Sequence, residues 1–155
     1  MYIIIIGYLL YDFFEYFIHN IAHCRYNSYL KYYHSIHHKS QYPLNKLMDY
    51  APYKNEPYVF LIFSPYIMIY SFLLYFLFEW NNYIIILGEN SILLFISDHL
   101  HSNYHIKGSY LEKYSWFLKR RELHFNHHKK IKTNYSLGGL TYIFDIFFKT
   151  YNYNK

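Results

Sequence analysis

The eleven histidines of this 155-residue chain fall into four short clusters, and none lies elsewhere. Neutral imidazole is the commonest metal ligand in proteins, and spacings of three and four residues place ring nitrogens on one face of a helix. The spacing therefore predicts a metal site rather than scattered surface histidines. The clusters are His19 and His23; His34, His37 and His38; His99, His101 and His105; and His124, His127 and His128.

These histidines are too many for one metal ion. A tetrahedral zinc ion takes about four ligands, so the economical interpretation is two metal ions that share a histidine-rich cage. We expect His99 to be the histidine outside the cage. The adjacent pairs His37-His38 and His127-His128 are our candidates for the catalytic histidines. The expected metal ligands are His19, His23, His34, His37, His38, His101, His105, His124, His127 and His128.

The two triplets share one arrangement. In each, two histidines lie on one helix face and the third is turned by about 100°, which suits ligation of one metal ion plus a contact to the second. Asp12 and Glu15 precede His19 at steps of three and four residues, so either could accept a hydrogen bond from the N–H of a ligand ring. Asp98 is a similar candidate beside the third cluster.

Ligand type alone does not identify the metal, because imidazole suits zinc, copper, iron and nickel. The expected reaction favours iron. Apolar helices beside the site indicate a lipid substrate, and a pair of irons can use O2 to oxidise an unactivated C–H bond. Zinc has no redox chemistry and cannot do this.

Composition supports a membrane protein. Hydrophobic residues make up 54% of the chain and charged residues 16%, which is more apolar than an average soluble domain. The net charge of +5 then favours anionic lipid as a partner, and no basic motif resembles a nucleic-acid-binding fold. The single cysteine, Cys24, excludes an intrachain disulfide and a cysteine-rich metal site.

Three apolar segments are expected to be helices in or on the membrane: residues 2–18, 58–77 and 83–97. The second has about 20 residues without a charge, enough to cross a bilayer. Proline residues at 43, 52 and 57 predict irregular chain before it, and Gly138-Gly139 predicts a break after the last cluster.

Basic residues give the expected topology. Five Lys and Arg residues lie between His19 and Lys54, none from Asn55 to Ile106, and ten from Lys107 onward. By the positive-inside rule both basic segments face the cytoplasm, and the helical hairpin between them lies in the membrane. The alternative is a monotopic hairpin that dips into the membrane and returns, which gives the same sidedness. We therefore predict an all-α integral membrane helical bundle with a cytosolic, histidine-rich di-metal cap. Its single domain, 1–155, comprises a first membrane helix (1–18), a helical hairpin (58–97) and the cap (19–57 and 98–155).

The chain resembles the fatty acid hydroxylase / sterol desaturase superfamily of membrane di-iron oxygenases. Asp12-FFEYFI-His19-NIA-His23, followed by a tyrosine-containing spacer and His34-SI-His37-His38, is similar to the family pattern D-x3-Y-x2-HR-x2-H and HxxHH. His124-FN-His127-His128, with Asn134-Tyr135 and Phe144-Asp145 after it, is similar to the family's second HxxHH and its N-Y and W-D ending. Sphingolipid C4-hydroxylases and C-4 methylsterol oxidases look closest.

This resemblance implies an O2-dependent lipid hydroxylase or desaturase with two iron ions (Fe2+). Its substrate would be a sterol, fatty acid or sphingoid base, and its location the endoplasmic reticulum in a eukaryotic host. Electrons would come from a cytochrome b5-type donor and an NAD(P)H reductase, because the chain has no GxGxxG motif or haem-domain motif. The basic run Lys119-Arg120-Arg121 and the pair Lys129-Lys130 could bind an acidic donor or lipid headgroups.

The chain departs from the family pattern at four places. Asn20 replaces an arginine, Ala51 precedes Pro52 where the family has histidine, Phe144 replaces tryptophan, and Lys149 replaces glycine. Two alternatives therefore stay open. The same fold could oxidise a carotenoid or an ether lipid, or the chain could be a truncated membrane protein that binds metal without turnover.

Overall fold

The computed structural model describes residues 2–24, 28–50, 52–54, 59–136 and 141–153. In that part of the chain the regular structure is helical, and its one β-bridge joins Asp49 to Ile106. The predicted all-α membrane fold is confirmed. The segment 42–50 is irregular, as its proline predicts. The predicted break at Gly138-Gly139, Pro57 and the Ala51 departure lie outside the described residues.

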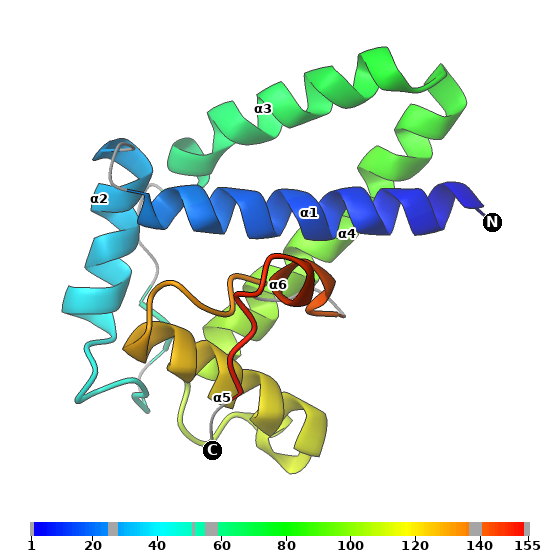
Figure 1. The fold of residues 1–155 in the computed structure, drawn as a ribbon. Helices are drawn as coiled ribbons and strands as arrows, with labels where there is room; N and C mark the ends of the chain where they lie inside the picture. Colours follow the sequence, from blue (N-terminus) through cyan, green and yellow to red (C-terminus); the bar gives the residue numbers. More distant parts are fainter. Residues whose placement is uncertain (1, 25–27, 51, 55–58, 137–140, 154–155) are drawn as a thin grey trace.

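Three long helices form the body of the molecule (Figure 1). They are α1 (Tyr2–His23), α3 (Val59–Leu77) and α4 (Trp80–Tyr104). Helices α3 and α4 form a hairpin, and α1 packs along α4 with its amino-terminal end near the turn of that hairpin. Both α1 and α4 continue past the predicted membrane limits of Ile18 and Ser97, so the first and third histidine clusters extend the same helices.

Among the described residues, α1 and α4 are long and apolar enough to cross a membrane, and α3 contributes the shorter apolar stretch Phe63–Leu77. At 1.5 Å per residue α1 and α4 measure about 33 and 37 Å, against about 30 Å for the hydrocarbon core of a bilayer. Their outer faces carry large apolar side chains with at least two fifths of their surface exposed, such as Phe17 of α1 and Ile92 and Phe95 of α4. Such a surface has no favourable contact with water and suits lipid.

The bundle is held by apolar contacts and a few buried polar pairs. Ile3, Leu74 and Ile86 bring α1, α3 and α4 together in one core cluster. The Asn90 amide of α4 donates a hydrogen bond to the Tyr70 hydroxyl of α3 at 2.7 Å. Polar side chains inside an apolar bundle pair with one another because lipid offers them no partner.

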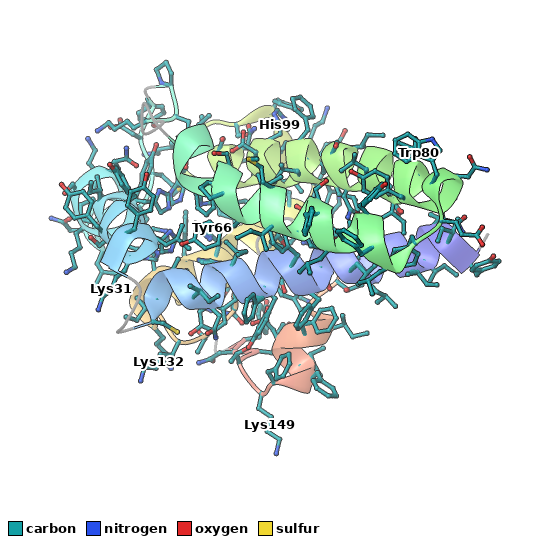
Figure 2. All side chains as sticks on the ribbon, turned by 90° about the horizontal axis from the view of Figure 1, so that it is seen from above. Lys31, Tyr66, Trp80, His99, Lys132 and Lys149 are labelled. Atoms are coloured by element: carbon teal, nitrogen blue, oxygen red, sulfur yellow. The ribbon has the colours of Figure 1, made fainter. Side chains whose placement is uncertain are left out.

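The shorter elements form the cap. Four of them lie around the carboxyl-terminal ends of α1 and α4, namely α2 (Ser28–Ile36), the π-helix η1 (His37–Gln41), the 3-10 helix η2 (Tyr110–Lys113) and α5 (Ser115–Lys129), whereas α6 (Ile143–Phe147) packs beside the middle of α1 (Figure 1). Lys31 and Lys132 lie at the end with these four elements, opposite Trp80 at the hairpin turn (Figure 2). Lys31 and Lys132 thus lie at the same end of the molecule as the carboxyl-terminal end of α1, which carries His19 and His23.

The π-helix begins at His37, directly where the second histidine cluster lies. Its wider turn is closed by the Tyr42 N–H, which donates to the His37 carbonyl at 2.9 Å. Short π segments are frequent at functional sites because they shift the register of the side chains. Here the shift stacks the buried Tyr42 ring on His105, with ring centres 3.9 Å apart.

Candidate metal centre

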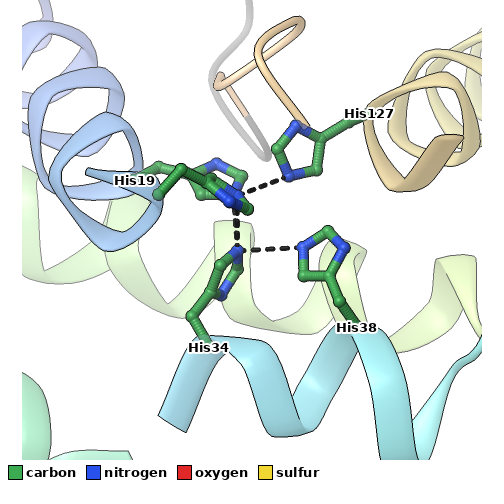
Figure 3. Close-up of side chains that lie close together, drawn as sticks. His19, His34, His38 and His127 are labelled. Carbon is green, nitrogen blue, oxygen red and sulfur yellow. Dashed lines mark hydrogen bonds between the residues drawn. The ribbon is translucent and has the colours of Figure 1, made fainter. Parts of the chain in front are cut away.

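Five histidines from three separate parts of the chain converge at the end of α1. They are His19, His23, His34, His38 and His127, and one nitrogen from each lies within 4.8 Å of the others. We call these five the proximal group. Figure 3 shows four of them around one point. The Nε2 atom of His34 lies 3.1 Å from that of His19, 2.9 Å from that of His23 and 3.0 Å from that of His38.

Backbone carbonyls fix which nitrogen of these rings faces the centre. A carbonyl only accepts, so His19 Nδ1–H donates to the Tyr135 carbonyl at 2.6 Å, and His127 Nδ1–H donates to the Thr133 carbonyl at 2.6 Å. In a neutral ring the proton on Nδ1 leaves Nε2 with a lone pair. The lone pairs of His19 and His127 therefore point into the group, as metal ligation requires.

A second group lies beside the first and contains His37, His101, His105 and His124, whose ligand nitrogens again lie within 4.8 Å of one another. We call it the distal group. His105 donates from Nδ1 to the Leu47 carbonyl at 2.7 Å, and its Nε2 lies 2.9 Å from that of His124. His128 is adjacent, with its Nε2 atom 3.1 Å from the same His124 nitrogen.

The two triplets divide between the groups in opposite ways. His34 and His38 join the proximal group and His37 the distal group, whereas His127 is proximal and His124 distal. A helix makes this division because residues four apart share a face and the residue between them turns away. The four candidate catalytic histidines lie along the boundary, where the His38 and His128 rings stack with centres 4.0 Å apart.

The donor set fits two metal ions. His34 Nε2 has three imidazole nitrogens at hydrogen-bond distance, but one ring nitrogen holds either one proton or one lone pair and cannot satisfy three partners. Two ligands about 2.1 Å from one metal at a right angle would be about 3.0 Å apart. Five nitrogens also exceed the four ligands of a structural zinc site. His37 Nε2 and His101 Nε2 are buried without a hydrogen-bond partner, as expected of ligand atoms.

Burial keeps the rings neutral. It lowers the pKa of His37, His124 and His127 well below the ordinary value, and neighbouring histidines lower each pKa further. The same causes lower the pKa of His105 to about 3. Only a neutral imidazole binds metal, so the fold holds these side chains in the binding form at neutral pH.

The structure brings all ten expected ligands into or beside the two groups, and ligation by each stays a prediction. His99 lies apart: it is exposed, and its Nε2 atom lies 2.8 Å from the Tyr110 hydroxyl. The prediction that Asp12 or Glu15 accepts a ring proton does not hold for His19, His105 or His127. Asp12 accepts from the Thr141 hydroxyl at 3.1 Å, and backbone carbonyls take the ring protons instead.

One supporting residue, Asp145, was marked in the sequence only by the family motif. Asp145 of α6 is fully buried, and its carboxylate accepts from Tyr135 N–H at 2.8 Å, Ser136 N–H at 2.9 Å and the Thr150 hydroxyl at 2.7 Å. It thereby fixes the segment that contains Tyr135, whose carbonyl accepts the hydrogen bond from His19. The family motif marked Asp145, but its spacing could not reveal which histidine it supports.

Arg121 also has a structural role. It is buried, forms an ion pair with Glu112 at 2.7 Å, and donates to the carbonyls of Asn103 and Ile106 at 3.2 and 3.1 Å. These bonds fix the end of α4 next to His105. The prediction that Arg121 belongs to an exposed basic docking face is therefore wrong, since its charge is used inside the cap.

A cavity of about 540 Å³ leads from the histidines into the bundle. Its lining follows one face of α1 from Tyr11 to Ala22 and one face of α4 from Ser91 to His101. Its inner wall is mostly apolar, with Phe63 and Ile67 contributed by α3. The histidines that line it are His19, His34, His37 and His101, so both groups border the same space.

The fatty acid hydroxylase family model matches residues 4–150, nearly the whole chain. The chain belongs to the fatty acid hydroxylase family. No curated protein and no solved structure matches it. The match includes all four histidine clusters, and it confirms the resemblance seen in the sequence motifs.

Membership establishes the general class of the protein. The family consists of membrane-associated, metal-dependent oxidoreductases, and its type of reaction is lipid hydroxylation or desaturation. The nine histidines of the proximal and distal groups could bind the metal, and α1 and α4 supply helices suited to a membrane.

Proposed function

We propose that this protein catalyses the O2-dependent hydroxylation or desaturation of a lipid at a di-iron centre held by the proximal and distal groups. The observation that carries the proposal is the cavity, which joins an apolar space inside the helical bundle to histidines of both groups. A lipid chain in that space would present a C–H bond to the boundary between the groups. The chemistry expected of the bound iron pair is oxidation of that bond by O2 with electrons from an external donor.

The chain's own residues bind and orient the parts. Apolar side chains of α1, α3 and α4 bury the lipid and exclude water, which stabilises the bound chain by about 25 cal/mol per Å² of apolar surface. The carbonyls of Tyr135, Thr133 and Leu47 hold the rings of His19, His127 and His105 in one orientation. Fixed ligands keep the metal positions constant while the substrate enters and leaves.

The electron donor is proposed to be a separate cytochrome b5-type protein served by an NAD(P)H reductase. Exposed Lys119 and Lys129 lie on α5, the same short helix as His124 and His127, and exposed Lys130 directly follows it. A positive surface there would attract an acidic donor and bring it near the metal. We further propose a multi-pass topology with the histidines on the cytoplasmic side, where the positive-inside rule places the basic cap.

Product analysis with isotopic oxygen tests the proposal. Iron-loaded protein in lipid vesicles, with a cytochrome b5 and its reductase, is supplied with mixed lipids under 18O2. Hydroxylation incorporates one 18O atom into a lipid, whereas desaturation removes two hydrogens and incorporates none. The identity of the oxidised lipid shows whether the substrate is a sterol, fatty acid or sphingoid base, or instead a carotenoid or an ether lipid.

Matched histidine variants provide the control. His37→Ala and His127→Ala remove one ligand from each group and should abolish product formation. His99→Ala removes a histidine outside both groups and should leave it unchanged. Unchanged turnover in His37→Ala would contradict the proposed centre. Folded, iron-loaded protein that forms no product from any lipid class would favour a metal-binding protein without turnover.

A further inference from the structure

A cluster of three polar side chains lies within the wall of the cavity, below the histidines. Glu15 of α1 and Ser97 of α4 both line it, and the Ser97 hydroxyl donates to Glu15 Oε1 across the two helices. The Tyr11 hydroxyl, one turn earlier on α1, donates to the same oxygen at 3.2 Å. Polar groups within an apolar helical bundle are costly, and their presence at a cavity wall indicates a binding role.

The position of this polar cluster relative to the metal centre is set by helix geometry. Glu15 precedes His19 by four residues on α1, and Ser97 precedes His101 by four residues on α4. Four residues correspond to about 6 Å along a helix. The Glu15–Ser97 pair therefore lies one turn below a layer made of one histidine from each group.

The charges of the cavity select among polar lipids. Glu15 and Asp98 line it, and among the described lining residues there is neither lysine nor arginine. At the level of Glu15, one helical turn from the histidines, a free carboxylate would meet an acidic side chain with no lysine or arginine beside it, which is unfavourable in a site of low dielectric constant. A hydroxyl or amino group, by contrast, donates a hydrogen bond that a carboxyl oxygen can accept.

We propose that Glu15, held by Tyr11 and Ser97, is a subsite for a hydrogen-bond-donating group of the lipid, either a hydroxyl or an amine. The bound group sets the register of the chain, so that the oxidised carbon lies about 6 Å from it, a few carbon atoms away. The subsite selects long-chain alcohols or amines over free fatty acids. It depends on the proposed function, since the cavity must hold the lipid substrate.

Equilibrium binding tests the subsite without turnover. Four probes of equal chain length are compared on the full chain in detergent: octadecan-1-ol, octadecylamine, octadecane and stearate. Native mass spectrometry or a competition assay gives each Kd. The expected result is that the alcohol and the amine bind about tenfold or more tightly than octadecane, as one hydrogen bond to a carboxyl group allows. Stearate should bind no more tightly than octadecane.

Two substitutions at Glu15 distinguish the contribution of its hydrogen-bond acceptor from that of its negative charge. Glu15→Leu removes the acceptor and should abolish the preference for both polar probes. Glu15→Gln keeps a carbonyl oxygen but removes the charge, so the alcohol should retain its preference while the amine loses its own. Glu79→Gln, at the exposed hairpin turn, is the matched control and should change nothing. Ser97→Ala is the second variant, used if Glu15→Leu fails to fold. It keeps the Glu15 acceptor and should retain the preference for the alcohol.

Equal binding of octadecan-1-ol and octadecane by the native protein would overturn the subsite, as would a preference that persists in folded Glu15→Leu. A preference for stearate would also overturn it. These outcomes differ from failure of the proposed function. Selective binding without any oxidised product would contradict the enzymatic proposal alone, whereas oxidation of a lipid without selective binding would contradict the subsite alone.

Discussion

Removing the Asp145 carboxylate should lower the metal affinity of the proximal group and leave that of the distal group unchanged. This carboxylate holds the chain whose Tyr135 carbonyl accepts the His19 ring proton. Thr133, whose carbonyl holds His127, lies two residues earlier. The distal group has other supports, since Leu47 holds His105. One buried substitution should therefore separate the two metal sites.

The expected magnitudes follow from the three hydrogen bonds to Asp145. Asp145→Ala leaves the buried N–H groups of Tyr135 and Ser136 without an acceptor, which should cost about 3–5 kcal/mol of stability. Asp145→Asn keeps one oxygen but turns an amide toward the Ser136 N–H, at a cost of about 1–3 kcal/mol. Loss of support behind a ligand lowers metal affinity by about 10- to 100-fold.

Metal content measured against a graded chelator provides the assay. Native protein and Glu79→Gln should retain two metal ions per chain at chelator concentrations where Asp145→Asn retains one. Helical content by circular dichroism checks that the variant is folded. If folded Asp145→Asn keeps both metal ions with unchanged affinity, the inferred link from Asp145 to His19 is wrong.

Three other predictions follow from the structure. Lys149 has a positive φ of 59° after α6, where the Thr150 and Lys149 N–H groups close the helix on Asp145 and Ile146. Lys149→Gly should raise stability by about 1 kcal/mol, and Lys149→Ala should not; equal melting temperatures for the two variants would refute this. Because the folded pKa values of His37, His124 and His127 are lowered, these rings are neutral in the fold but take up protons in the unfolded chain below pH about 6.5. Metal-free protein should then lose about 1.4 kcal/mol per pH unit for each ring as pH falls below that value, and a flat unfolding free energy between pH 7 and 5 would contradict it. Chelation of the metal at pH 7.5 should lower the melting temperature, because facing lone pairs about 3 Å apart lose the ion that binds them; an unchanged temperature would show that the histidines do not depend on metal.

Which histidines come together was largely predictable because helix periodicity is local. Spacings of three and four residues specify which histidines share a face, and the sequence needed no tertiary information to select ten candidates and set His99 apart. The split of each triplet between two groups also follows from the turn of a helix. The apolar helices were predictable for the same reason, although α4 continues to Tyr104 rather than ending at Ser97.

The supports of the site were not predictable from spacing. The carbonyls of Tyr135, Thr133 and Leu47 hold ligand rings through the backbone, and any residue type could supply them. Glu15 and Ser97 are 82 positions apart, so only the packing of α1 on α4 pairs them. The burial of Arg121 was hidden within a basic run because charge patterning does not reveal which cation points inward.

The measurement that tests the central proposal most directly is the metal content of protein purified in detergent without a metal-affinity tag or added metal. Two irons per folded chain, falling below one in both His37→Ala and His127→Ala but not in His99→Ala, is the predicted result. Folded protein that contains no metal, or the same iron content in all three variants, would contradict a di-iron centre at the ten candidate ligand histidines.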